Sequence, residues 1–167
     1  VAAVTSVGFF TDRVQRAMLL QATELLGADL AVVSADQVSG TLADGATERG
    51  LTIARFVTFP SVVLFGDAAQ LAELKAVDGG YPLRGRLRVA EEPFGPELEM
   101  ESGPGTGELW AEARLLQQMG FQVGDLLQVG DTELQVTRVL TYEPDRGGDL
   151  FQLAPRVMFN LADVPAT

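Results

Sequence analysis

The sequence predicts an α+β protein, and three observations support this fold class. Apolar residues recur at helical spacing around Asp12, several short β-type runs follow from about residue 51, and a Gly-Asp pair marks a tight turn between two of those runs. The chain has 167 residues, of which 47% are hydrophobic. It is therefore long enough and apolar enough to bury a core of its own.

The N-terminal stretch predicts one helix from about Ser6 to Leu26, with Gly27 as its stop. The segment before Asp12 carries no charge but is shorter than the ~20 apolar residues of a spanning helix. Three interpretations remain open: the tail of a transmembrane helix, the remnant of a signal segment, or an ordinary buried helix start. In the first, the membrane-proximal stalk has an exposed apolar surface formed by Phe9, Phe10, Val14 and Ala17.

Beyond this helix, runs of β-forming residues predict strands. Pro60 is expected to end one strand before the next begins, and the short "GDAAQ" connection predicts a hairpin, as does Gly130-Asp131. Short helices are expected near Ala43–Arg49 and at Glu112–Met119, the second capped by Gly120. The predicted strands are Asp29–Ser34, Leu51–Phe59, Val62–Gly66, Gln70–Val77, Glu108–Trp110, the alternating runs around Leu127 and Val136, and Arg156–Asn160, with a helix or turn after the last.

Two polar stretches invite functional interpretation. Arg84, Arg86 and Arg88 alternate, which places them on one strand face; a solvent face is favoured over an anion-binding patch. Glu91–Gly107 has the composition of a linker. Its "GPGTG" lacks the lysine-serine/threonine ending of a phosphate-binding loop and lies in acidic sequence, which argues against phosphate binding.

Composition excludes several classes of function. The formal net charge of -11 disfavours nucleic-acid partners, because such a field repels phosphate backbones. The chain has no cysteine and no histidine, so it lacks thiolate ligands, the usual zinc ligand and the usual general base. With Lys75 as the single lysine, the sequence predicts a non-catalytic domain without cofactor or metal.

The stretch "LTYEPDRGGDLF" offers a possible site. Glu143, Asp145 and Asp149 invite a calcium site or acid–base chemistry, but Arg146 falls among these acids and no neighbouring cluster completes the oxygen ligands. A loop this polar and glycine-rich also suggests solvent exposure, which disfavours a raised carboxyl pKa. A connection between subdomains is the favoured interpretation.

Several stretches resemble one family. "FTDRVQRAMLLQATELLGADLAVVSAD" is similar to the segment of MacB/FtsX-type ABC transporter permeases that leaves the first transmembrane helix. "GELWAEARLLQQMGFQVGDLLQVGDTELQVTRVLTYEPDRGGD" resembles the β-rich lobe of the same domain. "SVGFFTDR", "LGADL", "YPLRG" and "LTYEPDRGGD" are similar to the YbbP branch. The resemblance covers most of the chain and is weakest at Gln37–Glu48 and Glu91–Gly107.

This resemblance implies a two-lobed α+β, MacB-like extracytoplasmic (periplasmic) core domain of an inner-membrane permease. On that basis residues 1–27 form the stalk helix, 28–90 a membrane-proximal mixed-sheet lobe, 91–150 a small barrel-like lobe, and 151–167 a return to the first lobe. The returning strands and second transmembrane helix of the family are expected after Thr167.

The resemblance also implies a function. The domain would couple motion driven by a separate cytoplasmic ATPase subunit to the export or extraction of a hydrophobic or lipid-like compound, with a lysophospholipase-type esterase as a further partner. The membrane would be reached through flanking transmembrane helices. The alternatives are a membrane-tethered extracytoplasmic binding module without a transport role and, third, a carboxylate hydrolase.

Overall fold

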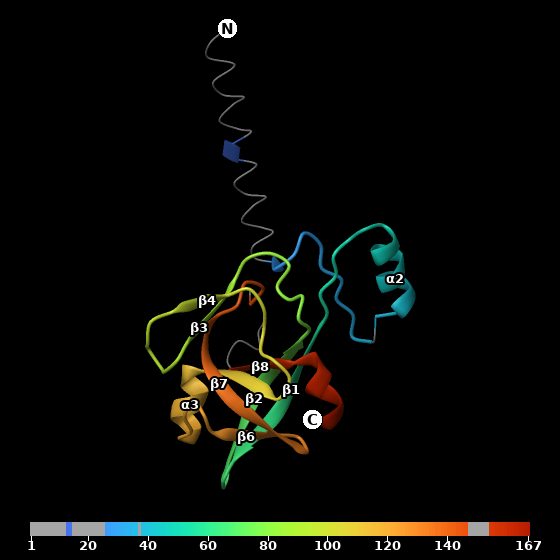
Figure 1. Ribbon diagram of the computed structural model, residues 1–167. Coiled ribbons are helices and arrows are strands. Elements are labelled where there is room, and N and C mark those ends of the chain that lie inside the picture. Colours follow the sequence, from blue (N-terminus) through green and yellow to red (C-terminus); the bar gives the residue numbers. More distant parts are fainter. Residues whose placement is uncertain (1–12, 15–25, 37, 147–153) are drawn as a thin grey trace, which may run out of the picture.

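The computed structural model describes residues 13–14, 26–36, 38–146 and 154–167. Its centre is a closed barrel of six strands (Figure 1). Around the ring each strand pairs with the next in the order β1, β2, β8, β5, β7, β6, and β6 closes the ring by pairing with β1. These strands are β1 (Phe56–Phe65), β2 (Ala68–Val77), β5 (Glu108–Glu112), β6 (Leu126–Val129), β7 (Thr132–Tyr142) and β8 (Arg156–Asn160).

A hairpin of β3 (Leu87–Ala90) and β4 (Leu98–Met100) extends the sheet beyond the barrel. It attaches through β3 to the second half of β7, whereas β6 pairs with the first half of β7. Because β4 lies inside the segment Glu91–Gly107, the expectation of a plain linker there is wrong in part. The acidic composition that suggested a linker belongs to an exposed edge strand, where charged side chains discourage pairing with other chains.

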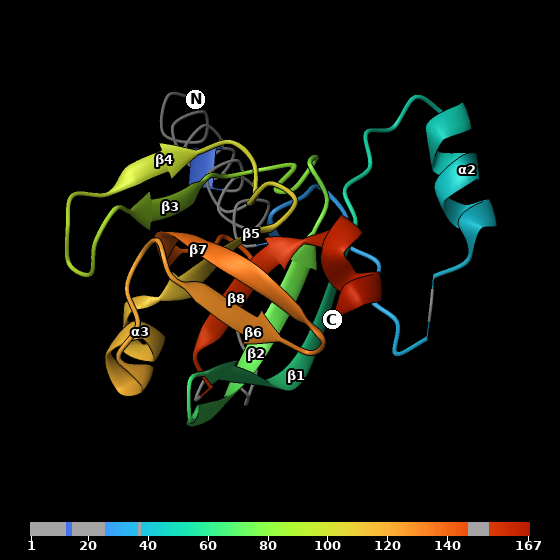
Figure 2. The ribbon, with the colours of Figure 1, turned by 60° about the horizontal axis from the view of Figure 1, so that its bottom comes forward.

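Three helical segments complete the described structure: α2 (Gly40–Glu48), α3 (Ala113–Met119) and the 3₁₀ segment η1 (Leu161–Ala166). Helix α3 buries Leu115, Leu116 and Met119 against the barrel and ends at Gly120, whose φ of 75° confirms the predicted cap. Helix α2 has no buried residues and stands apart from the barrel in both ribbon views (Figures 1 and 2).

The strands bury two cores, one on each face of the barrel wall. The barrel core fills the interior, with Leu74 and Ala76 from β2 and Phe159 from β8 among its members. The outer core lies between the barrel wall and the β3–β4 hairpin and contains Val77, Tyr81, Leu87, Val89, Trp110, Leu140 and Met158. A strand that borders both cores is therefore buried on both faces.

Most predicted strands and both hairpins are confirmed, with two corrections. Residues 29–34 form no strand: the chain there is irregular, and Leu30 and Val33 are 77% and 81% exposed. No strand among the described residues pairs with this segment, and β-forming side chains alone do not hold an extended chain in a sheet. Pro60 does not end a strand: β1 runs through it, and β6 pairs with β1 only at Val63 and Leu64, so the missing N–H of Pro60 is tolerated.

The two-lobed division is not confirmed. Segments 28–90, 91–150 and 151–167 each contribute strands to the same closed barrel, so hydrogen bonds cross every proposed boundary. The predicted stalk helix lies almost entirely outside the described residues, including Phe9, Phe10 and Ala17. Val14 is helical and partly buried, Leu26 is helical, and Gly27 has a φ of 62°, as expected at a helix end.

Candidate functional site

The outer face of β2 carries a buried cluster of charges. Side chains alternate along a strand, so Glu73 and Lys75 point away from the barrel core that Leu74 enters. Both are nevertheless buried, Lys75 to 2% exposure. The charge cluster consists of Glu73, Lys75, Tyr81, Glu143, Asp145 and Arg156.

The ammonium group of Lys75 is held on three sides. Its Nζ donates to Glu143 Oε1 at 2.5 Å, to Asp145 Oδ1 and Oδ2 at 2.7 and 2.8 Å, and to the Tyr81 hydroxyl at 2.8 Å. Tyr81 in turn donates its hydroxyl hydrogen to Asp145. The rings of Tyr81 and Phe56 lie 4.3 and 4.6 Å from Nζ, within the range of cation–π attraction. Every donor of the ammonium therefore has a partner.

Arg156 on β8 forms ion pairs with two carboxylates of the charge cluster, Glu143 and Glu73. Its Nε lies 3.0 Å from Glu143 Oε2, and its Nη1 lies 3.4 Å from Glu73 Oε2. These contacts are ion pairs rather than aligned hydrogen bonds. Three carboxylates thus face two cations in a region closed to water, and the attraction must offset the desolvation of all five charges.

Burial raises the pKa of two groups in the charge cluster, Glu143 and Tyr81. Desolvation raises the pKa of the Glu143 carboxyl, and the positive charges of Lys75 and Arg156 act against that rise. Desolvation also raises the pKa of the Tyr81 phenol, and the negative charges of Glu143 and Asp145 add to the effect. Tyr81 therefore stays neutral in the folded protein and serves as a hydrogen-bond donor.

The geometry of the charge cluster indicates a structural role. A lysine nucleophile needs an accessible amine, but Lys75 is buried and its Nζ is enclosed by Glu143 and Asp145. The residues it joins come from β2, from the segment after β2, from the segment after β7 and from β8. The charge cluster therefore fixes four parts of the chain to one another.

The charge cluster also lies against the end of the N-terminal segment, at Gly27. Gly27 is buried so close to Asp145 and Pro82 that an added Cβ would lie 3.7 and 3.8 Å from their Cβ atoms. Its carbonyl accepts a 2.8 Å hydrogen bond from the backbone N–H of Arg84. The Arg84 guanidinium binds both carboxylate oxygens of Asp29. We call these contacts of Gly27 and Asp29 the N-terminal joint.

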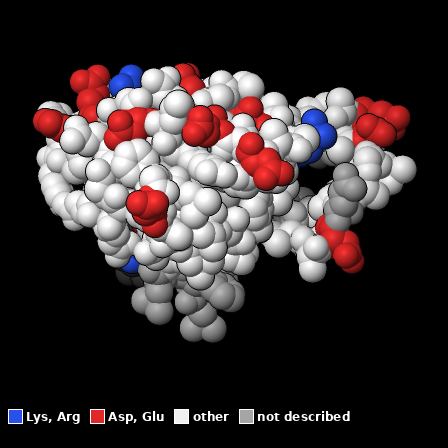
Figure 3. Space-filling model, turned by 90° about the horizontal axis from the view of Figure 1, so that it is seen from below, with Lys and Arg blue, Asp and Glu red and all other residues white. Residues whose placement is uncertain are grey.

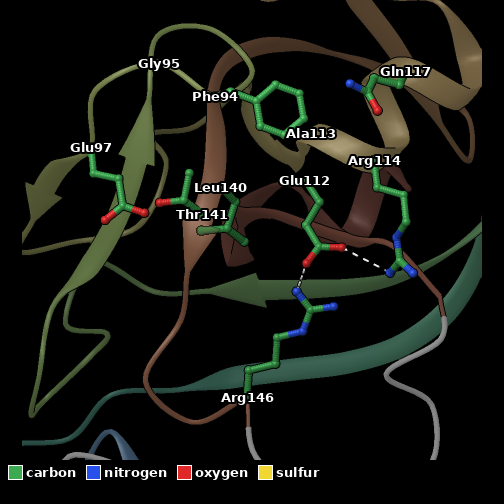
Figure 4. Close-up of a pocket in the computed structure, with 10 residues that line it drawn as sticks. All are labelled: Phe94, Gly95, Glu97, Glu112, Ala113, Arg114, Gln117, Leu140, Thr141 and Arg146. Carbon is green, nitrogen blue, oxygen red and sulfur yellow. Dashed lines mark hydrogen bonds and ion pairs between the residues drawn. The ribbon is translucent and has the colours of Figure 1, made fainter.

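An open hollow of about 560 Å³ lies between the β3–β4 connection, α3 and the end of β7 (Figure 4). At its centre Glu112 pairs with Arg146 through Oε1 and with Arg114 through Oε2, and Oε2 also accepts from the backbone N–H of Arg156. Burial is the main cause that lowers the pKa of Arg146. The remaining lining residues are Phe94, Gly95, Glu97, Ala113, Gln117, Leu140 and Thr141.

The glycine-rich stretch after β4 is structural. Backbone amides of Gly105 and Gly107 donate to the carboxylates of Glu108 and Asp163, so those amides already have anionic partners within the chain. Gly103 has a different reason for being glycine, because an added Cβ would lie 2.4 Å from a methyl group of Val77 in the outer core. The prediction against a phosphate-binding loop agrees with this geometry.

The structure corrects the interpretation of the loop after β7. Glu143 is buried and Asp145 is mostly buried, so the expected solvent exposure is wrong for both, while Asp149 lies outside the described residues. Arg146 pairs with Glu112 instead of neutralising the loop acids. The role of a connection between subdomains stays a prediction, and Lys75, Tyr81 and Arg156 are the partners that the sequence did not indicate. In the sequence, the indication of these partners was that Lys75, the single lysine, lies in the predicted strand Gln70–Val77.

The alternating arginines have acidic partners on the surface. Arg84 pairs with Asp29, and Arg86 and Arg88 pair with glutamates on and beside β4. The predicted solvent exposure is confirmed, but the placement on one strand face is wrong in part, because only Arg88 lies within β3. Acidic side chains outnumber basic ones on the face shown in Figure 3, in line with the net charge of -11.

The described part of the chain lacks both a membrane-spanning helix and a group of acids suited to a metal ion. None of its helices is long and apolar enough to cross a membrane. Its aspartates and glutamates form no group of three suited to hold a metal ion.

Comparison with known proteins gives one informative relative. No family model matches the chain. The chain is 34% identical over all of its 167 residues to a curated protein of Escherichia coli (strain K12), "Uncharacterized ABC transporter permease YbbP". It spans 20% of that protein's length. The resemblance to the YbbP branch of ABC transporter permeases that the sequence motifs indicate is therefore confirmed.

Proposed function

We propose that this chain is an extracytoplasmic domain of a MacB/FtsX-type ABC transporter permease in the inner membrane. In this proposal it couples motion driven by a cytoplasmic ATPase subunit to the export or extraction of a hydrophobic or lipid-like compound. The observation that carries the proposal is the identity of 34% along the whole chain to a permease. A lysophospholipase-type esterase is proposed as a further partner on family resemblance alone.

The N-terminal joint supports the coupling part of this proposal. Motion of a membrane helix reaches a soluble body only through contacts that hold the two together. The buried Gly27, its hydrogen bond from Arg84 and its contact with Asp145 are contacts of that kind. We propose that the stalk residues Phe9, Phe10, Val14 and Ala17 continue this path to the membrane.

Location is tested with one introduced cysteine, since these 167 residues contain none, in a parent permease from which any other cysteine is removed. Asp67, in the exposed turn between β1 and β2, is changed to cysteine in the parent permease. A membrane-impermeant maleimide added to intact spheroplasts should label it. Labelling only after the membrane is broken would place the domain in the cytoplasm and refute the proposal.

Coupling is tested in proteoliposomes that contain the parent permease and its ATPase. A short flexible Gly-Ser linker inserted between Leu26 and Gly27 should abolish ATP-driven extraction of a fluorescent lipid while ATP hydrolysis continues. The matched control carries the same linker between Gly66 and Asp67, far from the joint, and should retain extraction. Full extraction with the linker at Gly27 would contradict the coupling role.

A membrane-tethered binding module is the second candidate, and one observation favours it. The chain between Gly27 and β1 exposes large apolar side chains, among them Leu30, Val33 and Leu51. Such surface commonly marks a missing partner. If the linker at Gly27 leaves ATP hydrolysis and extraction intact but Leu30→Ser/Val33→Ser removes a co-purifying subunit, the binding module replaces the coupling domain.

A further inference from the structure

Phe94 is exposed to solvent, and its backbone conformation is unfavourable for a bulky residue. The residue is 83% exposed, and its φ of 64° lies in the left-handed region that bulky residues rarely adopt. The turn that holds it is closed by a 3.0 Å hydrogen bond from Gly95 N–H to the Glu92 carbonyl. Folding alone does not favour an exposed phenylalanine at this position, where glycine would be free of strain.

Phe94 forms one wall of the hollow described above. Figure 4 shows its ring on the same side of the hollow as Ala113 and Gln117 of α3. Leu140 of the outer core contributes apolar surface to the lining. The volume of about 560 Å³ falls within the usual range for small-molecule sites, roughly 300–1,000 Å³.

The polar part of the hollow holds two guanidinium groups, Arg114 and Arg146, and two carboxylates, Glu97 and Glu112, so its formal charges cancel. Glu112 faces the guanidinium groups of both Arg114 and Arg146. Arg146 is only 20% exposed, so water screens it weakly. A guanidinium has five N–H donors, and the pair with Glu112 engages Arg146 through Nη1. A carboxylate entering the hollow would meet cationic donors beside the apolar wall.

We infer that this hollow binds a small organic acid with an apolar body, stacked against Phe94 and with its carboxylate directed to Arg146. This site adjoins the charge cluster, because Glu112 accepts a hydrogen bond from the backbone N–H of Arg156, but it does not depend on the proposed transport role. The turn closed by Glu92 and Gly95 places the side chain of Phe94 at the edge of the hollow.

The test uses isothermal titration calorimetry on the 167-residue chain with 4-phenylbutyrate and the uncharged 4-phenylbutan-1-ol. The acid should bind at least about ten-fold more tightly than the alcohol, since a charge-assisted hydrogen bond distinguishes them. Addition of the acid should shift the side-chain amide resonance of Gln117 in the NMR spectrum.

Three variants assign the contributions. Phe94→Gly should weaken acid binding by at least about ten-fold while the melting temperature stays equal or rises, because strain is removed. Arg146→Gln should remove the preference for acid over alcohol. Leu126→Ala, an exposed apolar position on β6, should leave binding unchanged.

Three results would overturn the inference. They are no saturable binding of the acid, equal affinity for acid and alcohol, and unchanged affinity in Phe94→Gly. Because Phe94 lies in an exposed turn, that last variant keeps the test decisive even if Arg146→Gln fails to fold.

Discussion

Strand β2 is buried on both faces, but by different chemistry. On one face Leu74 and Ala76 enter the barrel core, a cluster of buried apolar side chains. On the other face Glu73 and Lys75 enter the charge cluster, beside the outer core. Apolar burial stabilises almost any arrangement that excludes water, whereas buried charges are stable only when each one meets its partner.

This difference assigns separate tasks to the two faces. The barrel core supplies most of the driving force for folding, since burial of apolar area is non-directional and large in sum. The charge cluster contributes less net stability but determines which segments lie together. It holds the loop after β7 against β2 and places Asp145 beside Gly27.

The largest effect is expected from Lys75→Ala. Removing this cation leaves Glu143 and Asp145 buried without their main partner, which should lower the free energy of unfolding by about 4 kcal/mol. Chemical denaturation measures the loss. The double variant Lys75→Ala/Asp145→Asn removes one charge of each sign and should recover at least about 1.5 kcal/mol relative to Lys75→Ala. Additive effects of Lys75→Ala and Asp145→Asn would contradict the pairing.

Leu74→Ala, on the other face of the same strand, should cost about 3 kcal/mol. Leu74 is fully buried, so the loss combines the lost apolar contacts with the cavity left in the barrel core. The same denaturation experiment should show no rescue by Asp145→Asn. Coupling between Leu74 and Asp145 would mean that the two faces do not act independently.

Gly103→Ala should cost about 2 kcal/mol by overpacking the outer core. The added methyl would lie 2.4 Å from Cγ2 of Val77, a stiff and fully buried side chain. Val77→Ala should relieve the clash and recover part of the loss in the double variant. Gly107→Ala is the matched control: its φ of 78° is strained for alanine, but nothing lies near its Cβ, so only about 1 kcal/mol is expected.

The smallest effect is expected at alkaline pH, where Tyr81→Phe should not change the phenolate absorbance of the folded protein. The pKa of Tyr81 is raised above its ordinary value of about 10, so the stability it contributes is present below pH ~10 and is lost as the pH rises further. While circular dichroism shows folded protein, absorbance at 295 nm should be the same for the native chain and Tyr81→Phe. An additional phenolate in the native chain before unfolding would show that Tyr81 is accessible.

Local signals in the sequence predict much of the fold. The hairpin at Gly130-Asp131, the cap at Gly120 and strand β8 all follow from nearby residues, and the structure confirms them. Closure of the barrel depends on pairing between β1 and β6, about sixty residues apart, and no local pattern specifies that pairing.

The sequence did not predict the charge cluster, and the reason is different. The alternation from Glu73 to Val77 is typical of a strand with one face in water, and alternation does not distinguish water from a buried ionic cluster. The acidic loop was misjudged in the same way, because its partner Lys75 is distant in sequence and its partner Arg156 lies on another strand, β8.

The irregular segment at Asp29–Ser34 illustrates the opposite failure. Its β-forming residues predicted a strand, but a strand requires a neighbour, and none of the described residues provides one. Propensity therefore predicted the wrong state where tertiary context was missing.

The central claim is that the charge cluster holds the N-terminal joint against the barrel, and native-state hydrogen exchange tests it most directly. In Asp145→Asn the amide of Arg84, which donates to the Gly27 carbonyl, should exchange at least about ten-fold faster. The amide of Gly120, which donates to Leu116 at the end of α3, should keep its rate. An unchanged rate at Arg84, or equal acceleration at Arg84 and Gly120, would contradict the claim.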